Sequence, residues 1–226
     1  MKLEVTVNND VTDTIHFDEF KGNADKEKYQ LVVYNGKREL LAILKDRKSS
    51  TIREYLESLP TTPSKVVIDL FKPFKNVIKS VLPEAEIIAD KYHYVRQMEW
   101  MIRDVRIRLH NQDIKYKEYK KYWRIISSNT RKLTANQKNR IEKLKNSNED
   151  FAKCYDNKVE FYELINSETL VKFNKRLKKL IIKLENSEIK ECIKLSTTLK
   201  NWEKEIKNSF KYKVDNEFVE GYNNKT

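Results

Sequence analysis

Apolar and polar positions follow two different rhythms along this chain. In residues 1–95, short apolar runs of strand length alternate with amphipathic segments of helical length. In residues 96–212, apolar residues recur every three or four positions almost without interruption. A period of two indicates half-buried strands, and a period of 3.6 indicates helices packed along one face. The pattern therefore predicts an α/β region followed by an all-helical one.

In the first region, the expected order is three strands, a helix, a strand, a helix and a last strand. The strands are predicted at residues 15–20, 29–34, 39–44, 66–71 and 85–90, and the first helix at 49–59. The second helix begins at Pro73, which suits a first turn, and Pro83 ends it. Asn35-Gly36 between two strands predicts a type I′ hairpin, because both central residues of that turn need positive φ.

This order places a hairpin-bearing antiparallel edge before parallel strands joined by helices. It is the order of the ribonuclease H-like, retroviral-integrase-like fold, although order alone makes that an analogy. The predicted fold class is thus an α/β ribonuclease H-like core, residues 1–95, with a large all-α insertion, residues 96–212. Residues 213–226 would return to the core.

The helical region shows several apolar stripes and one clear start signal. Thr134-x-x-Gln137 is a capping box before an apolar run. Neither glycine nor proline occurs between Pro83 and Gly221. Long helical hairpins or a bundle are therefore expected, with the stripes forming its core.

Composition narrows the partners. The chain has 46 Lys and Arg residues against 34 Asp and Glu, a net charge of +12. This balance favours an anionic partner, with nucleic acid first, although a lysine-rich solvated surface would give the same number. Only three glycines are present and no phosphate-binding loop, which argues against a nucleotide cofactor.

The cysteines, the N-terminus and the length of the apolar runs predict the cellular compartment of the protein. Cys154 and Cys192 are the only cysteines, with no Cys-x-x-Cys pair, so neither zinc nor a disulfide framework is expected, and both fit small core residues. The N-terminus lacks the layout of a signal peptide, and no apolar run approaches the roughly 20 residues of a membrane span. A cytoplasmic protein without membrane contact is expected.

Aspartates stand at the ends of two strands that should be neighbours. Asp18 and Asp69 would face each other at one edge of the sheet. Converging carboxylates can hold two Mg²⁺ or Mn²⁺ ions about 3.5–4 Å apart for phosphoryl transfer. A single aspartate after a strand is commonly a turn former or helix cap, so the argument rests on the pair. Asp90 opens an Asp-x-x-His step to His93, and Glu220 is a late acid.

These residues stand in segments that resemble the DDE transposases of bacterial insertion sequences, specifically the ISL3 family. The similar segments are FDEFKG (17–22), LKDR (44–47), the stretch from VVIDLF to YVRQM (66–98) and FVEGYNNK (218–225). The resemblance implies that Asp18, Asp69 and Glu220 form the catalytic, metal-binding triad. It gives Asp90 and His93 a supporting role rather than metal ligation.

The implied chemistry is metal-dependent phosphodiester cleavage at the element's ends, followed by attack of the freed 3′-hydroxyl on target DNA. The implied partner is double-stranded DNA, with a homo-oligomer assembled on it. Arg96, Arg103, Arg106 and Arg108 are candidate phosphate contacts, although a solvated helix face accounts for them equally well.

The chain also departs from the family pattern. Members of the family carry an N-terminal zinc-binding segment and a helix-turn-helix, whereas this chain begins almost at its first strand and lacks the zinc cysteines. Members continue beyond the glutamate with a basic helix, whereas this chain ends at Thr226. The expectation is a catalytic domain truncated at both ends. It would be inactive if Glu220 cannot reach the other acids.

Two other functions compete with transposition. The chain could be a non-catalytic DNA-binding remnant that regulates a full-length transposase, or a structure-selective nuclease on the same fold. Metal binding through Asp69 would distinguish the two catalytic functions, transposase and nuclease, from the non-catalytic regulator.

Overall fold

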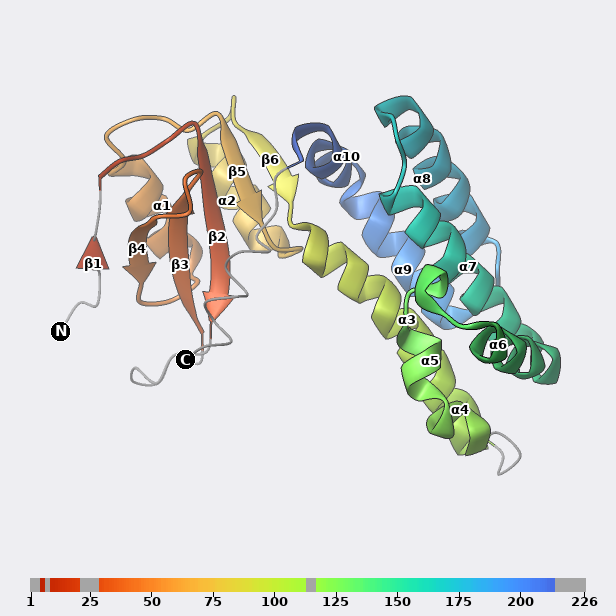
Figure 1. Cartoon of the computed structure of the whole chain (residues 1–226). Helices are drawn as coiled ribbons and strands as arrows, with labels where there is room; N and C mark the ends of the chain where they lie inside the picture. The colour runs from red at the N-terminus through yellow and green to blue at the C-terminus, as the bar shows by residue number, and fades with distance from the viewer. Residues whose placement is uncertain (1–4, 7–8, 21–28, 113–116, 214–226) are drawn as a thin grey trace. The chain divides into compact units, whose positions relative to one another are not determined.

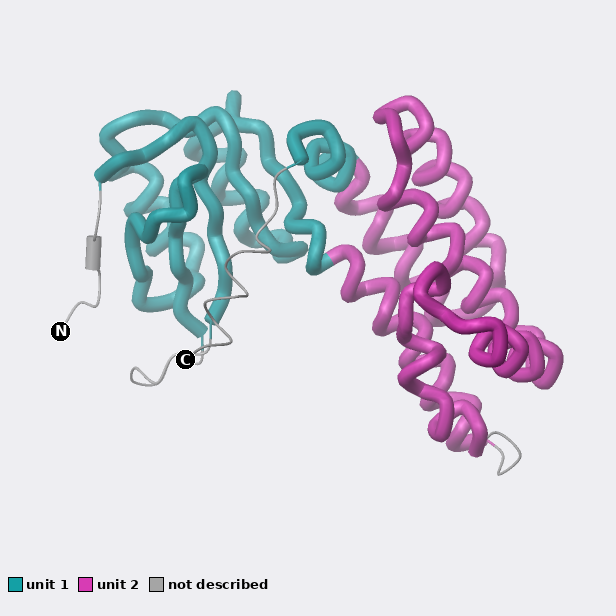
Figure 2. The backbone as a smooth tube through the Cα atoms, in the orientation of Figure 1, with its two compact units in different colours: residues 1–93, 204–226 teal, residues 94–203 magenta. Residues whose placement is uncertain are grey.

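The computed structural model describes residues 5–6, 9–20, 29–112 and 117–213, which belong to two compact units (Figure 2). Residues 1–93 and 204–226 form the first, here called the sheet unit. Residues 94–203 form the second, the helical unit. The helical unit is thus inserted into the chain of the sheet unit.

The sheet unit contains a mixed six-stranded sheet in the order β1-β4-β3-β2-β5-β6 (Figure 1). The strands are β1 (Val5–Thr6), β2 (Thr14–Phe20), β3 (Gln30–Asn35), β4 (Leu40–Leu44), β5 (Lys65–Ile68) and β6 (Glu86–Ala89). β2, β3 and β4 are antiparallel neighbours, whereas β5 and β6 run parallel to β2. An α/β fold is therefore confirmed. The two-residue β1 was not expected from the sequence.

The core of this unit follows from the apolar pattern. α1 (Ser49–Glu57) and α2 (Lys72–Val81) connect consecutive strands and lie on one face of the sheet (Figure 1). Their buried residues include Ile52, Leu56, Phe74 and Ile78. Pro73 stands in the first turn of α2, where a missing N–H removes no helical hydrogen bond.

The predicted type I′ turn after β3 is wrong, although the hairpin is present. No described glycine has a positive φ; instead Arg38 has a φ of 70°. The Asn35 N–H donates to Glu39 O at 3.0 Å, closing a three-residue loop with its left-handed residue last. Asn35 Oδ1 accepts hydrogen bonds from the N–H groups of Lys37 and Glu39. These side-chain bonds keep Asn35 in the strand and move the left-handed position three residues along.

α10 (Glu203–Tyr212) belongs mainly to the sheet unit, whereas the sequence pattern grouped it with the helical insertion. The Asn208 side-chain amide donates to Ile87 O on β6 at 2.8 Å. Glu205, which is 1 % exposed, pairs with Lys75 of α2 at 2.8 Å. An apolar stripe shows that a helix is buried on one side, but polar contacts such as these decide its partner.

The helical unit confirms the expected run of helices. They are α3 (Lys91–Gln112), which starts within the sheet unit, α4 (Lys117–Lys121), α5 (Trp123–Ser127), α6 (Ala135–Ser147), α7 (Glu149–Ile165), α8 (Leu170–Glu185) and α9 (Lys190–Asn201), with a 3₁₀ turn at Thr130–Lys132. The predicted capping box starts α6, with Thr134 and Gln137 bonded reciprocally. Among the described helices, none combines the length and apolar character that crossing a bilayer requires.

Candidate metal centre

Strand register brings three aspartates into one row. β2 and β5 pair with Thr14 opposite Lys65 and His16 opposite Val67. Continuing this register by two residues sets Asp18 opposite Asp69, the first residue after β5. The pairing of β5 with β6 likewise sets Asp69 opposite Asp90. Because parallel strands end at the same edge of a sheet, these three carboxylates, one from each of three neighbouring strands, point to a common region.

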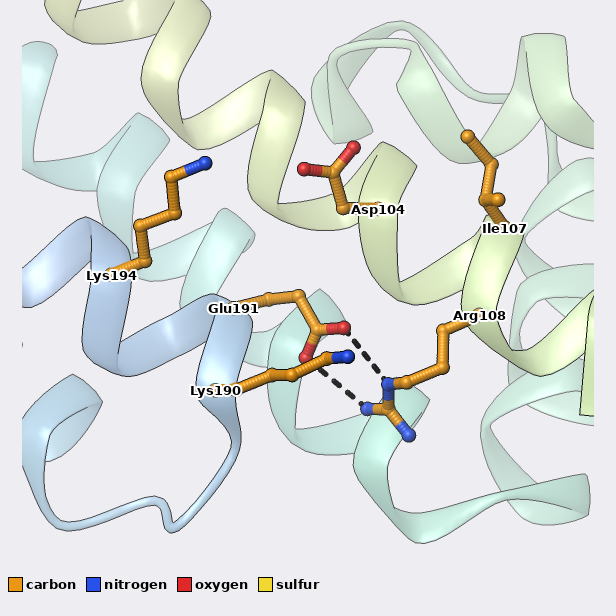
Figure 3. Close-up of a pocket in the computed structure, with 6 residues that line it drawn as sticks. All are labelled: Asp104, Ile107, Arg108, Lys190, Glu191 and Lys194. Atoms are coloured by element: carbon orange, nitrogen blue, oxygen red, sulfur yellow. Dashed lines mark hydrogen bonds and ion pairs between the residues drawn. The ribbon is translucent and has the colours of Figure 1, made fainter.

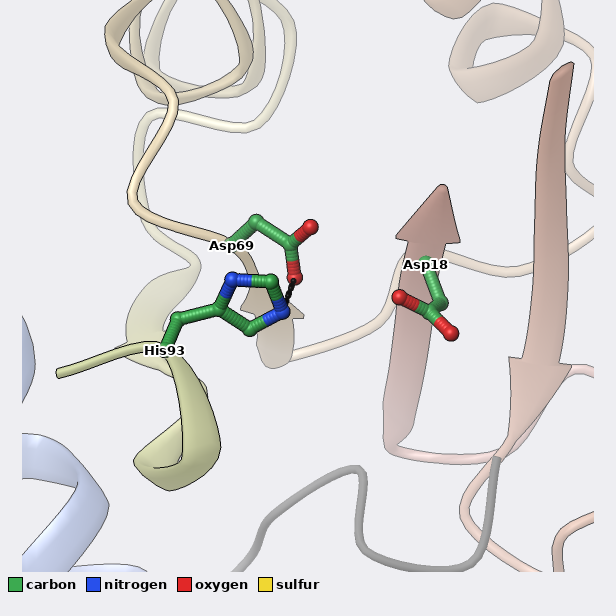
Figure 4. A group of neighbouring side chains, drawn as sticks. All are labelled: Asp18, Asp69 and His93. Atoms are coloured by element: carbon green, nitrogen blue, oxygen red, sulfur yellow. Dashed lines mark ion pairs between the residues drawn. The ribbon is translucent and has the colours of Figure 1, made fainter. Parts of the chain in front are cut away.

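In the structure, the side chain of His93 also lies beside these aspartates. Ligand atoms of Asp18, Asp69 and His93 all lie within 4.8 Å of one another (Figure 4). His93 stands in the first turn of α3, where its Nε2 is 2.9 Å from Asp69 Oδ1 and 3.7 Å from Asp90 Oδ2. Sequence reasoning gave this histidine only a supporting role. The Asp-x-x-His spacing could have predicted this position. A helix that begins directly after Asp90 turns the residue three positions later back over the end of the strand.

Burial and like charge shape the protonation of this acidic cluster. Asp18 and Asp69 are each 7 % exposed, and Asp90 is 1 % exposed. Burial, and then the neighbouring Asp69 and Asp90 charges, raise the pKa of Asp18 to about 7, although His93 acts in the opposite direction. For His93 burial alone would lower the pKa, but the carboxylates, Asp69 first, outweigh burial and raise it. The cluster therefore attracts positive charge, either as protons or as a cation.

The donor set fits a divalent metal ion. Asp69 Oδ1 is buried and faces His93 Nε2 at 2.9 Å, although the geometry of this contact is not that of a hydrogen bond. A buried carboxylate oxygen is costly unless a positive charge balances it, and either a protonated His93 or a metal ion can supply that charge. Carboxylate oxygens are the preferred ligands of Mg²⁺, and a mixed carboxylate and imidazole set also suits Mn²⁺. Asp18, Asp69 and His93 together offer both types.

The second residue of the Asp18-Glu19 step has a different task. Arg47 Nη1 lies 3.1 Å and 3.2 Å from the two carboxylate oxygens of Glu19. The Arg47 guanidinium also stacks on the rings of Tyr29 and Phe71, at 4.7 Å and 5.0 Å from their centroids. This network ties β2 to the segment that follows Asp69, and so it supports the position of both aspartates.

The remaining candidate residues are distributed differently. Glu220 lies outside the described residues. On α3, Arg96 and Arg103 stack on the ring of Trp100, with guanidinium carbons 4.6 Å and 5.7 Å from its centroid. Arg106 lies over Trp123 at 5.4 Å. These arginines therefore occupy aromatic faces of the helical unit.

Arg108 is already engaged by acids of its own unit. It donates to Glu191 at 2.8 Å and to Asp150 at 3.0 Å. It also borders an open hollow of about 410 Å³ between α3 and α9 (Figure 3). The hollow is lined by Asp104, Ile107, Arg108, Lys190, Glu191 and Lys194. Because acids and bases mix there, the hollow shows no single-sign charge that would select an anion.

Comparison with known protein families gives one clear match. The family model DDE_Tnp_ISL3, described as a transposase, covers residues 15–226. No curated protein and no solved structure matches the chain. The matched span contains Asp18, Asp69, Asp90 and His93, and it runs through both units.

Proposed function

Because the chain belongs to the ISL3 family of DDE transposases, we propose that its sheet unit is the metal-dependent catalytic core of a DNA transposase. The observation that carries the proposal is the buried convergence of Asp18 and Asp69, whose ligand atoms lie within 4.8 Å of each other and of His93. Paired, desolvated carboxylates of this kind are expected to be completed by a cation.

The sheet order supports a ribonuclease H-like core. Three antiparallel strands, β4-β3-β2, are followed by β5 and β6 running parallel to β2. In this arrangement the first and fourth long strands lie side by side, which is the pairing that brings Asp18 next to Asp69. The helical unit would then be the large insertion between the second acid and the last one.

Each side chain has a proposed task. Asp18, Asp69 and Glu220 would hold one or two Mg²⁺ or Mn²⁺ ions. Such an ion, when bound, lowers the pKa of a water or 3′-hydroxyl nucleophile and stabilises the leaving oxygen of a phosphodiester. Asp18, whose pKa is raised to about 7, must release its proton before it can bind a cation, and His93, whose pKa is also raised, must do the same before it can act as a ligand. His93, between Asp69 and Asp90, would fix the orientation of Asp69 or serve as a further ligand.

The proposed substrate is double-stranded DNA, at the element's ends and at the target, acted on by a homo-oligomer. Arg96, Arg103, Arg106 and Arg108 remain candidate phosphate contacts, with Arg108 the weakest because two acids already engage it.

Calorimetric titration of Mn²⁺ tests the proposal. The parent chain should bind Mn²⁺, and Asp69→Asn, which keeps the shape and removes the charge, should abolish binding. Asp13→Asn, an exposed aspartate of the same unit outside the cluster, is the matched control and should bind as the parent does. Glu220→Gln shows whether the last acid joins the site.

Nicking of supercoiled plasmid with Mn²⁺ then separates the catalyst from a regulator. A chain that binds DNA but neither binds Mn²⁺ nor nicks DNA would be a non-catalytic regulator, and the catalytic proposal would be wrong.

A further inference from the structure

The positive charge of this protein is concentrated in one unit. Residues 94–203 contain 26 Lys and Arg against 15 Asp and Glu, a net charge of +11. The sheet unit, residues 1–93 and 204–226, contains 20 against 19, a net charge of +1. The near-neutral unit holds the acidic cluster, and the basic unit holds almost all of the attraction for a polyanion.

Within the helical unit, α8 has the most one-sided charge pattern. It carries six cations, Lys172, Lys175, Arg176, Lys178, Lys179 and Lys183, and one acid, Glu185. Its inner face buries Phe173, Leu177 and Leu184 among others and packs against α7 and α9. The opposite face exposes Val171, Lys175, Lys178 and Ile182, which lie in one row because their spacing follows the helical period.

The cations at the border of this face are already paired. Lys172 pairs with Glu168, and Lys183 pairs with Glu160 at 2.7 Å. The single acid of the helix, Glu185, is held by Lys200 of α9 at 2.7 Å.

The central lysines differ. Lys175, Lys178 and Lys179 are exposed and have no ion pair or hydrogen bond with any residue that the structure describes. We call these three residues the α8 lysine stripe. Their charge is available to a partner outside the chain.

We propose that the α8 lysine stripe docks on the phosphate backbone of duplex DNA, independently of base sequence. The inference rests on the proposed DNA transposase function and adds the surface that holds the substrate. Lysine ammonium groups act as compact point charges and lack the planar fork with which arginine reads guanine, so backbone contact suits them better than base recognition.

The spacing of the stripe agrees with this partner. Four residues of helix separate Lys175 from Lys179, a rise of about 6 Å at 1.5 Å per residue. Phosphates of one strand follow each other about every 3.4 Å along the DNA axis, so the stripe can face two or three of them. A second copy of the chain fits less well, because self-complementary packing would bring two sets of unpaired lysines together.

Salt dependence of DNA binding tests the inference. The variant is Lys175→Gln with Lys178→Gln and Lys179→Gln. The matched control is Lys172→Gln with Lys183→Gln and Lys200→Gln, which removes the same formal charge from paired lysines nearby. Both are measured by fluorescence anisotropy on a short duplex of arbitrary sequence, in EDTA, between 50 and 200 mM salt.

The stripe variant should reduce the slope of log K against log salt by about 2 to 3, and weaken binding roughly tenfold at 150 mM, because each phosphate contact contributes about 0.9 to the slope. The control should change the slope by less than about 1. Equal slopes for the two variants would overturn the inference. So would a loss of self-association in sedimentation that is specific to the stripe variant, because the surface would then be a self-interface.

Two further readouts keep this result distinct from the catalytic proposal. Circular dichroism should show that both variants fold, since surface substitutions of this kind rarely change stability by more than about 0.5 kcal/mol. Mn²⁺ titration should be unchanged in the stripe variant. If the stripe variant binds Mn²⁺ normally but keeps the salt slope of the parent chain, only the DNA-docking role of the stripe is refuted. If the parent chain does not bind Mn²⁺, only the metal site is refuted.

Discussion

Replacing Asp18 by asparagine should stabilise the metal-free protein at high pH and leave it almost unchanged at low pH. Asparagine keeps the shape of the side chain and an oxygen that can still accept the Glu19 N–H bond. The free energies of unfolding of the two proteins should therefore differ only at pH values at which the aspartate is ionised. The buried position of Asp18 beside Asp69 makes that ionisation costly.

The magnitude follows from the pKa of Asp18, about 7 in the folded protein against 3.8 for a free carboxyl. A carboxyl whose folded pKa is raised contributes stability that is fully present below the unfolded pKa, near 4, and lost as the pH rises through about 7. A difference of about three units at about 1.4 kcal/mol each corresponds to roughly 4 kcal/mol. By pH 8, Asp18→Asn should therefore be more stable than the parent by several kcal/mol.

Urea unfolding in EDTA at pH 4.5, 6 and 8 measures this difference. All three tryptophans, Trp100, Trp123 and Trp202, lie in residues 94–203, so their fluorescence follows the helical unit, whereas circular dichroism follows both units. The pH-dependent gain should appear in the dichroism transition. If the two units unfold together, it appears equally in both signals.

An exposed aspartate serves as the control with the opposite sign. The hydrogen bonds that Asp13 accepts from Lys65 and Ser64 lower the pKa of its carboxyl, so the charge of Asp13 contributes stability above pH 4. Asp13→Asn should thus lose stability at pH 8. A stability difference between Asp18→Asn and the parent that is the same at pH 4.5 and pH 8 would refute the reasoning. With Mn²⁺ at 100 times its dissociation constant, the parent should gain about 2.7 kcal/mol and Asp18→Asn nothing.

Three further outcomes are expected. Arg38→Gly should raise the free energy of unfolding by about 1 kcal/mol, because Arg38 has a φ of 70°, and Arg38→Ala, which keeps a Cβ, should not; equal effects would contradict this reading of the turn. Leu177→Ala, at a fully buried site, should cost about 2–5 kcal/mol in urea unfolding, whereas Ile182→Ala, 57 % exposed on the same helix, should cost less than about 1 kcal/mol. The thiols of Cys154 and Cys192, both fully buried with sulfurs 3.2 Å apart, should react with Ellman's reagent only in urea, and rapid reaction of the native protein would show that this core opens.

The sequence predicted the elements better than their partners. The five long strands, α1, α2 and the run of helices agree with the apolar periodicity to within a few residues. Periodicity works because it records which side of an element is buried. It does not record what covers that side, which is why α10 was grouped with the insertion although Asn208 and Glu205 tie it to the sheet unit.

The turn after β3 shows the same limit at short range. Asn35-Gly36 is a sound local signal for positive φ at both residues. A different loop is stabilised by the hydrogen bonds that Asn35 Oδ1 accepts from the N–H groups of Lys37 and Glu39, and by the one that Thr12 Oγ1 accepts from the Gly36 N–H at 2.7 Å. Two or three additional hydrogen bonds are enough to outweigh the local preference of Asn-Gly for a type I′ turn.

By itself, the sequence determined which acids could act together, because Asp18 and Asp69 stand near the ends of strands that the element order makes neighbours. Only the tertiary structure decided that they share a register row with Asp90, that His93 turns back to within 2.9 Å of Asp69, and that the unpaired lysines of α8 face outward while Arg108 is held by two acids. The reason is physical. Composition and period are properties of a segment, whereas a binding site depends on distances between segments, and those are set by the register of strands and the packing of helices.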